Sequence, residues 1–222
     1  MKKEDTNFII ELKRKIHQSI VRKKIKKHSF TIISQNCLGG VIYNMLKMPF
    51  QSPTINLFIE DEDFVKLVEN PKYYFSIEPV PYIEQYIEPM DSTIKYPLIK
   101  VGDIVIHCRH YENCKEAIEA WDRRRKRIDY DNIYIIATDW NLHNKEGLID
   151  RIEESNYPKV IFTYKRYNKI NCVHLKGEKW KIDNRGLVRP AIPNYSENGY
   201  IRNFEELMDF PKWINEGIVK EK

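Results

Sequence analysis

The stretch FTIISQNCLGG, residues Phe30–Gly40, decides how this chain folds. Its apolar run stops abruptly at the polar residues Ser34–Cys37, two glycines follow, and the next residues, VIYNMLKM, are apolar at helical spacing. This order predicts a buried strand, a tight turn and a helix. Ligands of open α/β sheets bind at the carboxyl ends of strands, and the first N–H groups of a following helix point there. We therefore expect half of a functional site in this turn.

Length and composition are those of an ordinary globular protein. The chain has 222 residues, of which 42% are hydrophobic and 31% are charged, enough for one large domain or one domain with an appendage. No apolar run reaches the ~20 residues that a bilayer span needs, and the start of the chain shows no apolar signal core. Four cysteines without a CxxC pair indicate reduced thiols and a cytoplasmic location.

The positive charge is concentrated at the N-terminus. Residues 1–28 hold ten basic and three acidic side chains, a net charge of +7, while the whole chain carries +5, so the remainder carries −2. A slightly acidic body disfavours nucleic-acid binding. Residues 7–27 are predicted to be a helix with one apolar stripe, which consists of Phe8, Ile9, Leu12, Ile16 and Ile20. Such a helix either contacts an anionic membrane peripherally or packs on the domain with a solvated basic face, and we favour the second interpretation.

The rest of the chain alternates predicted strands and helices. Strands are expected at 55–59, 104–108, 132–138 and 159–164, with helices at 61–74, 112–128 and 146–154, and edge or irregular strands over 75–100. This alternation predicts an α/β fold of three layers around a largely parallel sheet. After residue 168 the pattern changes to short strands at 172–176 and 178–182 and a closing helix at 204–214. We expect a basic helix (1–28), a core (29–167) and a small C-terminal α+β extension (168–222).

Four segments, in this order, resemble a bacterial family of unknown function. They are SQNCLGG, SPTINLF, DIVIHCRHY and EAIEAWDRRRKRI, beginning at residues 34, 52, 103 and 116. Members of the family are commonly labelled exopolysaccharide or capsule biosynthesis proteins. The resemblance covers nearly the whole chain and implies a Rossmann-like fold and a role in building surface glycan. It assigns no catalytic residue.

The turn after the first strand offers a candidate nucleophile. The helix dipole stabilises a thiolate at a helix N-terminus and so lowers the pKa of the thiol below the ~8.5 of an ordinary cysteine. Cys37 is therefore a candidate nucleophile. Asn36 is an amide donor for an oxyanion, and Ser34, Gly39 and Gly40 complete the loop. The alternative is that Cys37 is an inert small residue and that Asn36 closes the turn. We favour a ligand-contacting loop over a nucleophile.

The end of the 104–108 strand supplies a candidate base. If this strand neighbours the first one, His110 serves as base to Cys37 or as a donor to a phosphate, with Tyr111 beside it. His107, inside the apolar run, is expected to be a core histidine hydrogen-bonded to backbone. A metal site that combines these residues with Cys108 and Cys114 is disfavoured, because adjacent strand residues point to opposite faces.

Two further candidates lie later in the chain. Arg124, in the run RRRKR that begins at residue 123, shares a helix face with Trp121 and is the arginine best placed to grip a phosphate. The rest of the run is expected to be solvated. Asp139 follows the third strand and is either a base, an acceptor for a sugar hydroxyl, or a turn residue.

The sequence disfavours two common classes of enzyme. GxGxxG and GxxxxGK[ST] are both absent, which disfavours dinucleotide redox and P-loop chemistry, and no cofactor is indicated. The leading hypothesis is a cytoplasmic transferase that acts on an activated sugar or glycan, with acyl transfer as one variant. Its site is lined by Ser34–Gly40, His110, Tyr111 and Asp139. The alternative is a non-catalytic scaffold that docks on a membrane assembly through residues 1–28.

Overall fold

The structure is a computed structural model that describes residues 3–89, 91–139, 146–177 and 191–222. Its helices are α1 (Lys3–Lys24), α2 (Leu38–Leu46), α3 (Asp61–Glu69), α4 (Pro71–Ser76), α5 (Cys114–Arg125), α6 (Glu146–Glu154), α7 (Asn203–Leu207) and α8 (Phe210–Glu216). Its strands are β1 (Thr31–Ser34), β2 (Phe58–Ile59), β3 (Val80–Ile87), β4 (Lys95–Val101), β5 (Ile104–His107), β6 (Ile133–Thr138), β7 (Lys159–Thr163) and β8 (Cys172–His174).

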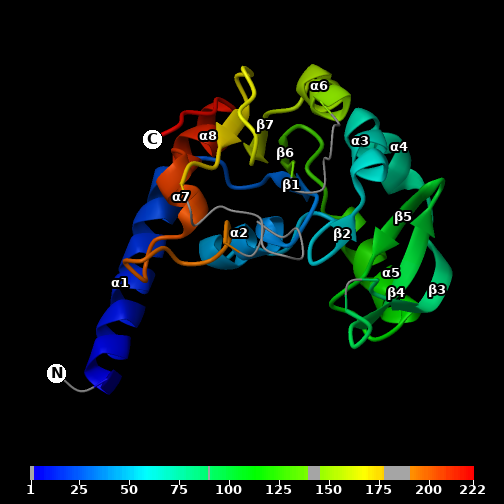
Figure 1. Ribbon diagram of the computed structural model, residues 1–222, viewed down its shortest axis with the longest axis horizontal. Helices are drawn as coiled ribbons and strands as arrows, with labels where there is room; N and C mark the ends of the chain where they lie inside the picture. The colour runs from blue at the N-terminus through cyan, green and yellow to red at the C-terminus, as the bar shows by residue number, and fades with distance from the viewer. Residues whose placement is uncertain (1–2, 90, 140–145, 178–190) are drawn as a thin grey trace.

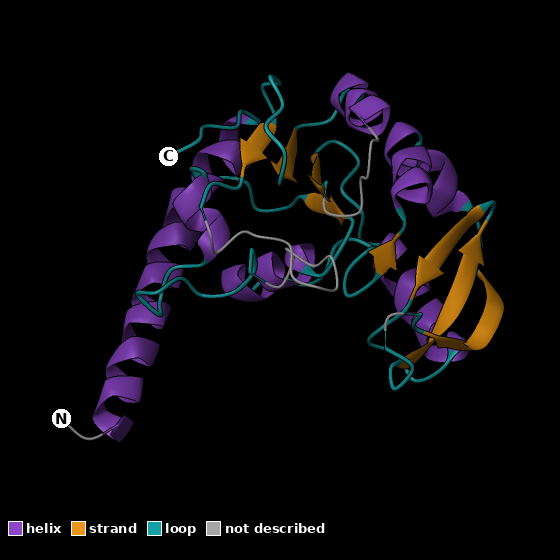
Figure 2. Ribbon diagram, in the orientation of Figure 1, coloured by secondary structure: helices purple, strands orange, loops and turns teal. Residues whose placement is uncertain are grey.

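The strands form two separate sheets. The first is fully parallel in the order β1-β6-β7-β8, and the second is antiparallel in the order β2-β5-β4-β3. Figures 1 and 2 show the antiparallel sheet with α5 on one side of the molecule and the parallel sheet with α1, α7 and α8 on the other. The α/β class is confirmed, but the expectation of one largely parallel sheet missed the antiparallel one.

Two hydrophobic cores lie on opposite faces of the parallel sheet. Ile32 and Ile33 are adjacent in β1 and fully buried, yet they belong to different cores, because successive strand residues point to opposite faces. The Ile32 core includes side chains of α2 and α8, among them Trp213. The Ile33 core includes α3, α6, the antiparallel sheet and Trp121 of α5. The parallel sheet is therefore covered by helices on both faces.

Two expectations for the middle of the chain are corrected. The helix expected over 61–74 is two helices, because Pro71 starts a new one and the Asn70 side chain accepts a hydrogen bond from the Tyr73 N–H at 3.3 Å. Strand β4 is central in its sheet, although residues 75–100 were expected to form only edge or irregular strands. Pro97 is tolerated there because its backbone faces Cys108, just beyond the end of β5. The Pro97 carbonyl accepts the Cys108 N–H at 3.0 Å, and the Cys108 carbonyl accepts the Tyr111 N–H at 3.0 Å, so it does not depend on a donor from residue 97.

The C-terminal segment joins the main sheet. Strand β8 pairs with β7 in parallel, and the helix expected at 204–214 is present as α7 and α8, which are separated at Met208 and Asp209. The strand expected at 178–182 lies outside the described residues. None of the helices in the described part of the chain combines the length and the apolar composition needed to cross a bilayer.

Candidate active site

Cys37 and His110 meet at the junction between the two sheets. Cys37 is the N-cap residue of α2, directly after the β1 turn, and His110 lies in the loop between β5 and α5. The Cys37 Sγ lies 3.2 Å from the His110 Nε2, although the two residues are 73 positions apart. The thiol is partly exposed. A thiol within hydrogen-bond distance of an imidazole is the arrangement in which the imidazole can take the thiol proton.

Strand pairing does not produce this contact. Strands β1 and β5 belong to different sheets, so the condition under which the sequence placed His110 beside Cys37, that the two strands are neighbours, is not met. The sheets are instead joined through the backbone of Gln35, one residue beyond β1. Its N–H donates to the Ile136 carbonyl in the parallel sheet at 3.1 Å, and its carbonyl accepts the N–H of Ile59 in the antiparallel sheet at 3.2 Å.

The Gln35 side chain strengthens the same junction. It is 2% exposed; its amide nitrogen donates to Asp61 at the start of α3, and its amide oxygen accepts the Thr138 N–H at 3.1 Å. A buried amide with partners in two elements resists displacement, because each lost bond would leave a buried polar group unsatisfied. The sequence reasoning did not single out Gln35. The sequence signal that could have identified Gln35 is its position, an uncharged polar residue directly after a buried strand.

The turn that carries Cys37 satisfies much of its own backbone. The Asn36 Oδ1 accepts the Leu38 N–H at 3.0 Å, and the Ser34 Oγ accepts the Gly39 N–H at 3.3 Å. Two of the first N–H groups of α2 therefore already have acceptors within the chain. The contact of Asn36 is the one expected if this residue closes the turn. Whether Ser34 or Asn36 also contacts a ligand stays a prediction.

Packing explains the two glycines of this turn. A Cβ on Gly39 would lie 3.0 Å from the Ile55 Cδ1 and 3.0 Å from the Ser34 Cβ. A Cβ on Gly40 would lie 2.7 Å from the Asn56 Oδ1. Helix α2 thus approaches the 55–56 segment at a distance that a side chain would prevent. Their role as ligand contacts stays a prediction.

Arg124 and Tyr111 form a layer next to the His110 loop. Arg124 is only 7% exposed, and its Nη1 donates to the Ile55 carbonyl at 2.7 Å. Its guanidinium lies 5.2 Å from the ring centroid of Phe50 and 6.0 Å from that of Tyr111. Burial raises the pKa of the Tyr111 hydroxyl, with Arg124 acting in the opposite direction. Arg124 thus packs against the loop and is buried, whereas Arg123 and Arg127 are exposed.

Asp139 lies at the carboxyl edge of the parallel sheet and is tied to the exit of β7. Its two carboxylate oxygens accept the N–H groups of Tyr164, at 2.6 Å, and Lys165, at 3.1 Å. Burial raises the pKa of the carboxyl group, and these backbone hydrogen bonds oppose that shift. Asp139 thus links the end of β6 to the loop that follows β7. A catalytic role for it stays a prediction.

The other histidine and cysteines of this region are buried, and each has a hydrogen-bond partner of its own. The His107 Nδ1 lies 3.2 Å from the Tyr96 hydroxyl, so its partner is a side chain and not the expected backbone. Cys108 donates to the Ile106 carbonyl and Cys114 to the Leu98 carbonyl. Among the residues that the structure describes, no three His, Cys, Asp or Glu side chains converge where a metal ion would fit.

A hollow of about 670 Å³ lies elsewhere, beside β8 at the opposite edge of the parallel sheet from β1. Arg166, Lys169 and His174 contribute to its wall. The Lys169 ammonium pairs with Asp150, and the backbone N–H of His174 donates to a Glu221 carboxylate oxygen at 3.0 Å. The Cys172 thiol in that wall lies 3.9 Å from a Glu153 carboxylate oxygen, but burial raises its pKa to about 12, which disfavours the thiolate. We therefore place the candidate active site at Cys37 and His110.

The comparisons with known proteins give a family but no activity. Residues 9–215 match the family described as "Domain of unknown function (DUF1919)", and the chain belongs to this family. It is also similar to an uncharacterized protein of Haemophilus influenzae (strain ATCC 51907 / DSM 11121 / KW20 / Rd). The two are 29% identical over 198 residues, which cover 88% of each chain. The predicted membership in a bacterial family of unknown function is thus confirmed.

Proposed function

We propose that this member of the DUF1919 family is a cysteine-dependent acyltransferase of surface-polysaccharide assembly. One observation carries the proposal: the 3.2 Å separation between the Cys37 Sγ and the His110 Nε2. The position of Cys37 at the N-cap of the nine-residue helix α2 adds to it, since a helix N-terminus favours a thiolate. The glycan context rests on the sequence resemblance, and the acceptor is a hydroxyl of an activated sugar or glycan.

The proposed reaction has two balanced steps. His110 takes the Cys37 proton, the sulfur attacks the carbonyl carbon of an acyl ester or thioester donor, and the imidazolium protonates the departing group. This leaves an acyl group on the Cys37 sulfur. In the second step His110 takes the proton of the acceptor hydroxyl, the hydroxyl oxygen attacks the thioester, and the Cys37 sulfur departs and is reprotonated by the imidazolium.

Acyl transfer fits these residues better than glycosyl transfer. A thiolate is a strong nucleophile toward carbonyl carbon, and the resulting thioester is reactive enough to pass its acyl group to an alcohol. Asp139, the carboxylate that a glycosyl transfer would most readily use, is bonded to two backbone N–H groups. We place the reaction in the cytoplasm, where cysteines remain reduced.

The test uses an activated ester with purified full-length protein. With p-nitrophenyl acetate, we expect a burst of nitrophenolate of about one equivalent and an acetyl group on the peptide that contains Cys37. Cys37→Ala should lose both, while its circular dichroism spectrum and melting temperature stay close to wild type. The peptides that contain Cys108, Cys114 and Cys172 are internal controls. Acetylation spread over all four cysteines, or a burst that survives Cys37→Ala, would contradict the proposal.

A second candidate, a non-catalytic scaffold, is favoured by the exposed apolar surface of α1. A panel of an acyl-thioester, a nucleotide-sugar and a nucleoside diphosphate in thermal-shift experiments separates the two candidates. An acyltransferase should be stabilised by the acyl-thioester, because a ligand that binds only the folded state raises its melting temperature. A scaffold should respond to none of the three.

A further inference from the structure

Helix α1 carries a row of large apolar side chains that face solvent. The row, which we name the α1 stripe, consists of Phe8 (72% exposed), Ile9 (40%), Leu12 (48%), Ile16 (52%) and Ile20 (48%). Four of these residues recur every fourth position, so they lie on one face of the helix. The stripe runs from Phe8 to Ile20, which at ~1.5 Å per residue is ~18 Å. A contiguous exposed apolar surface of this kind indicates an interaction site.

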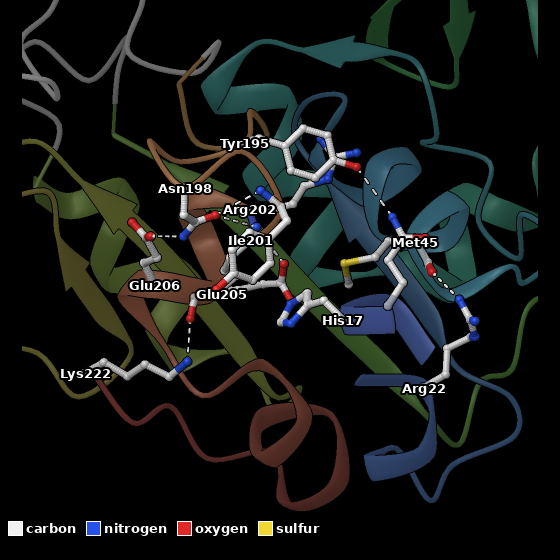
Figure 3. Close-up of polar contacts among 12 residues, drawn as sticks. His17, Arg22, Met45, Tyr195, Asn198, Ile201, Arg202, Glu205, Glu206 and Lys222 are labelled. Atoms are coloured by element: carbon white, nitrogen blue, oxygen red, sulfur yellow. Dashed lines mark hydrogen bonds and ion pairs between the residues drawn. The ribbon is translucent and has the colours of Figure 1, made fainter. Parts of the chain in front are cut away.

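The opposite side of α1 is held by the body of the protein. The His17 Nε2 lies 2.8 Å from a carboxylate oxygen of Glu205 in α7, and the Arg22 Nη1 donates to the Met45 carbonyl of α2 at 3.1 Å (Figure 3). Val21 is buried in the core. With about 100° of rotation per residue, Val21 falls roughly opposite the centre of the stripe, about 150° from it, and His17 lies to one side, about 110° from it. The body therefore fixes the orientation of α1 and leaves the stripe facing outward.

Exposed lysines accompany the stripe. Lys13, Lys15, Lys23 and Lys24 are all exposed on α1, and residues 1–28 carry a net charge of +7 against −2 for the rest of the chain. A second copy of this chain on the stripe would bring these like charges together. An anionic lipid surface instead accepts the apolar side chains below its headgroups and pairs with the ammonium groups at the level of its phosphates.

We infer that α1 docks the protein on an anionic membrane surface, with the α1 stripe inserted at the interface and the flanking lysines on lipid phosphates. Figure 1 shows that the N-terminal part of α1 extends beyond the rest of the molecule, so the stripe can approach a flat surface. Docking of this kind would hold the protein beside membrane-bound acceptors. The inference does not depend on any chemistry at Cys37.

The first test measures binding of the full-length protein to vesicles by co-sedimentation. Vesicles of phosphatidylglycerol and phosphatidylcholine should bind it at least ~10-fold more tightly than phosphatidylcholine alone, and added salt should weaken the binding. The triple variant Phe8→Ser, Leu12→Ser, Ile16→Ser should lose at least ~10-fold in affinity and keep its fold, since these side chains are exposed. The matched control is Val80→Ser, Ile170→Ser, Ile218→Ser, which removes three exposed apolar residues from other surfaces.

A second variant tests the charge component. Lys13→Gln, Lys15→Gln, Lys24→Gln should weaken binding to the anionic vesicles ~10²-fold, which corresponds to about 1 kcal/mol for each of the three lysines, and should reduce the salt dependence. Lys47→Gln, Lys115→Gln, Lys126→Gln removes the same charge from exposed positions outside α1 and should bind like wild type. Binding that is equal on neutral vesicles, or unaffected by the serine variant, would overturn the inference. The inference would also be overturned if the wild-type protein bound no vesicles but sedimented as a dimer that the serine variant converts to a monomer. That result would assign the stripe to a second copy of this chain.

Discussion

The molecule contains two cysteine–histidine neighbourhoods that differ in every property relevant to chemistry. His107 and Cys108 are adjacent in sequence, are buried at the end of β5, and bond to the Tyr96 hydroxyl and the Ile106 carbonyl respectively. Cys37 and His110 are distant in sequence, are more exposed, and contact each other at 3.2 Å. Adjacency along a strand separates two side chains onto opposite faces, whereas the junction of the two sheets brings two turns together.

This difference shows where reactivity can arise in this fold. Burial raises the pKa of the Cys108 thiol to about 12 and lowers the pKa of the His107 imidazole to about 4, so at neutral pH both are uncharged and inert. The Cys37 thiol instead lies at a helix N-terminus, beside the imidazole of His110.

The largest effect is expected at His110. Replacing it by Gln keeps a polar side chain in the loop but removes the group that accepts the Cys37 proton. Acylation of Cys37 by p-nitrophenyl acetate at neutral pH should slow by ~10²–10⁴-fold, measured from the rate of the nitrophenolate burst. At high pH, where hydroxide ionises the thiol, the deficit should shrink. A variant that acylates at the wild-type rate at neutral pH would remove His110 from the mechanism.

The buried histidine should affect stability, not reactivity. Its unfolded-state pKa is ~6.5 and burial lowers the folded-state value to about 4, so the unfolded chain binds the proton first as the pH falls. His107 therefore contributes stability above pH ~6.5, and up to about 3 kcal/mol of it is lost as the pH falls to ~4.

Urea unfolding of wild type and His107→Gln across this pH range measures the contribution as the difference between the two slopes. The variant should lose less stability than wild type between pH ~6.5 and ~4, even if it is less stable throughout. Equal slopes would mean that the His107 imidazole titrates normally in the fold.

A smaller effect is expected from the turn glycines. Gly39→Val would press new methyl groups against Ile55 and Ser34, where even a Cβ lies at 3.0 Å, and overpacking of this kind costs about 1–3 kcal/mol. The control is Gly147→Ala in α6, where an added Cβ meets nothing within 4 Å and a small gain in helix stability is expected. Urea midpoints check both. A Gly39→Val protein as stable as wild type would show that the turn is not tightly packed.

Much of the local structure was predictable because it depends on local patterns. The apolar run before Ser34 and the glycines after Cys37 predicted the β1–turn–α2 unit, and regular spacing predicted α6 within residues 146–154. The break at Pro71 was also readable from the sequence in principle, since proline begins a helix more readily than it continues one.

The partition into two sheets was not predictable from local patterns. Which strands pair depends on contacts distant in sequence, and the Gln35 backbone bonds that join the sheets leave no periodic signal. The sequence analysis placed His110 beside Cys37 only on the condition that the two strands are neighbours, and the contact arises without that pairing. The packing of Arg124 against Tyr111 and the 50–55 segment is equally non-local.

The most direct measurement of the central claim is the alkylation rate of each cysteine as a function of pH, determined peptide by peptide with iodoacetamide. The internal references are the other three cysteines. Burial raises the pKa of Cys108 and of Cys172 to about 12, and it also raises the pKa of Cys114. The account predicts that Cys37 reacts much faster than all three, with a midpoint below ~8.5, and that His110→Gln slows it. A Cys37 that reacts as slowly as Cys108 across the pH range would contradict the claim that this turn carries a nucleophile.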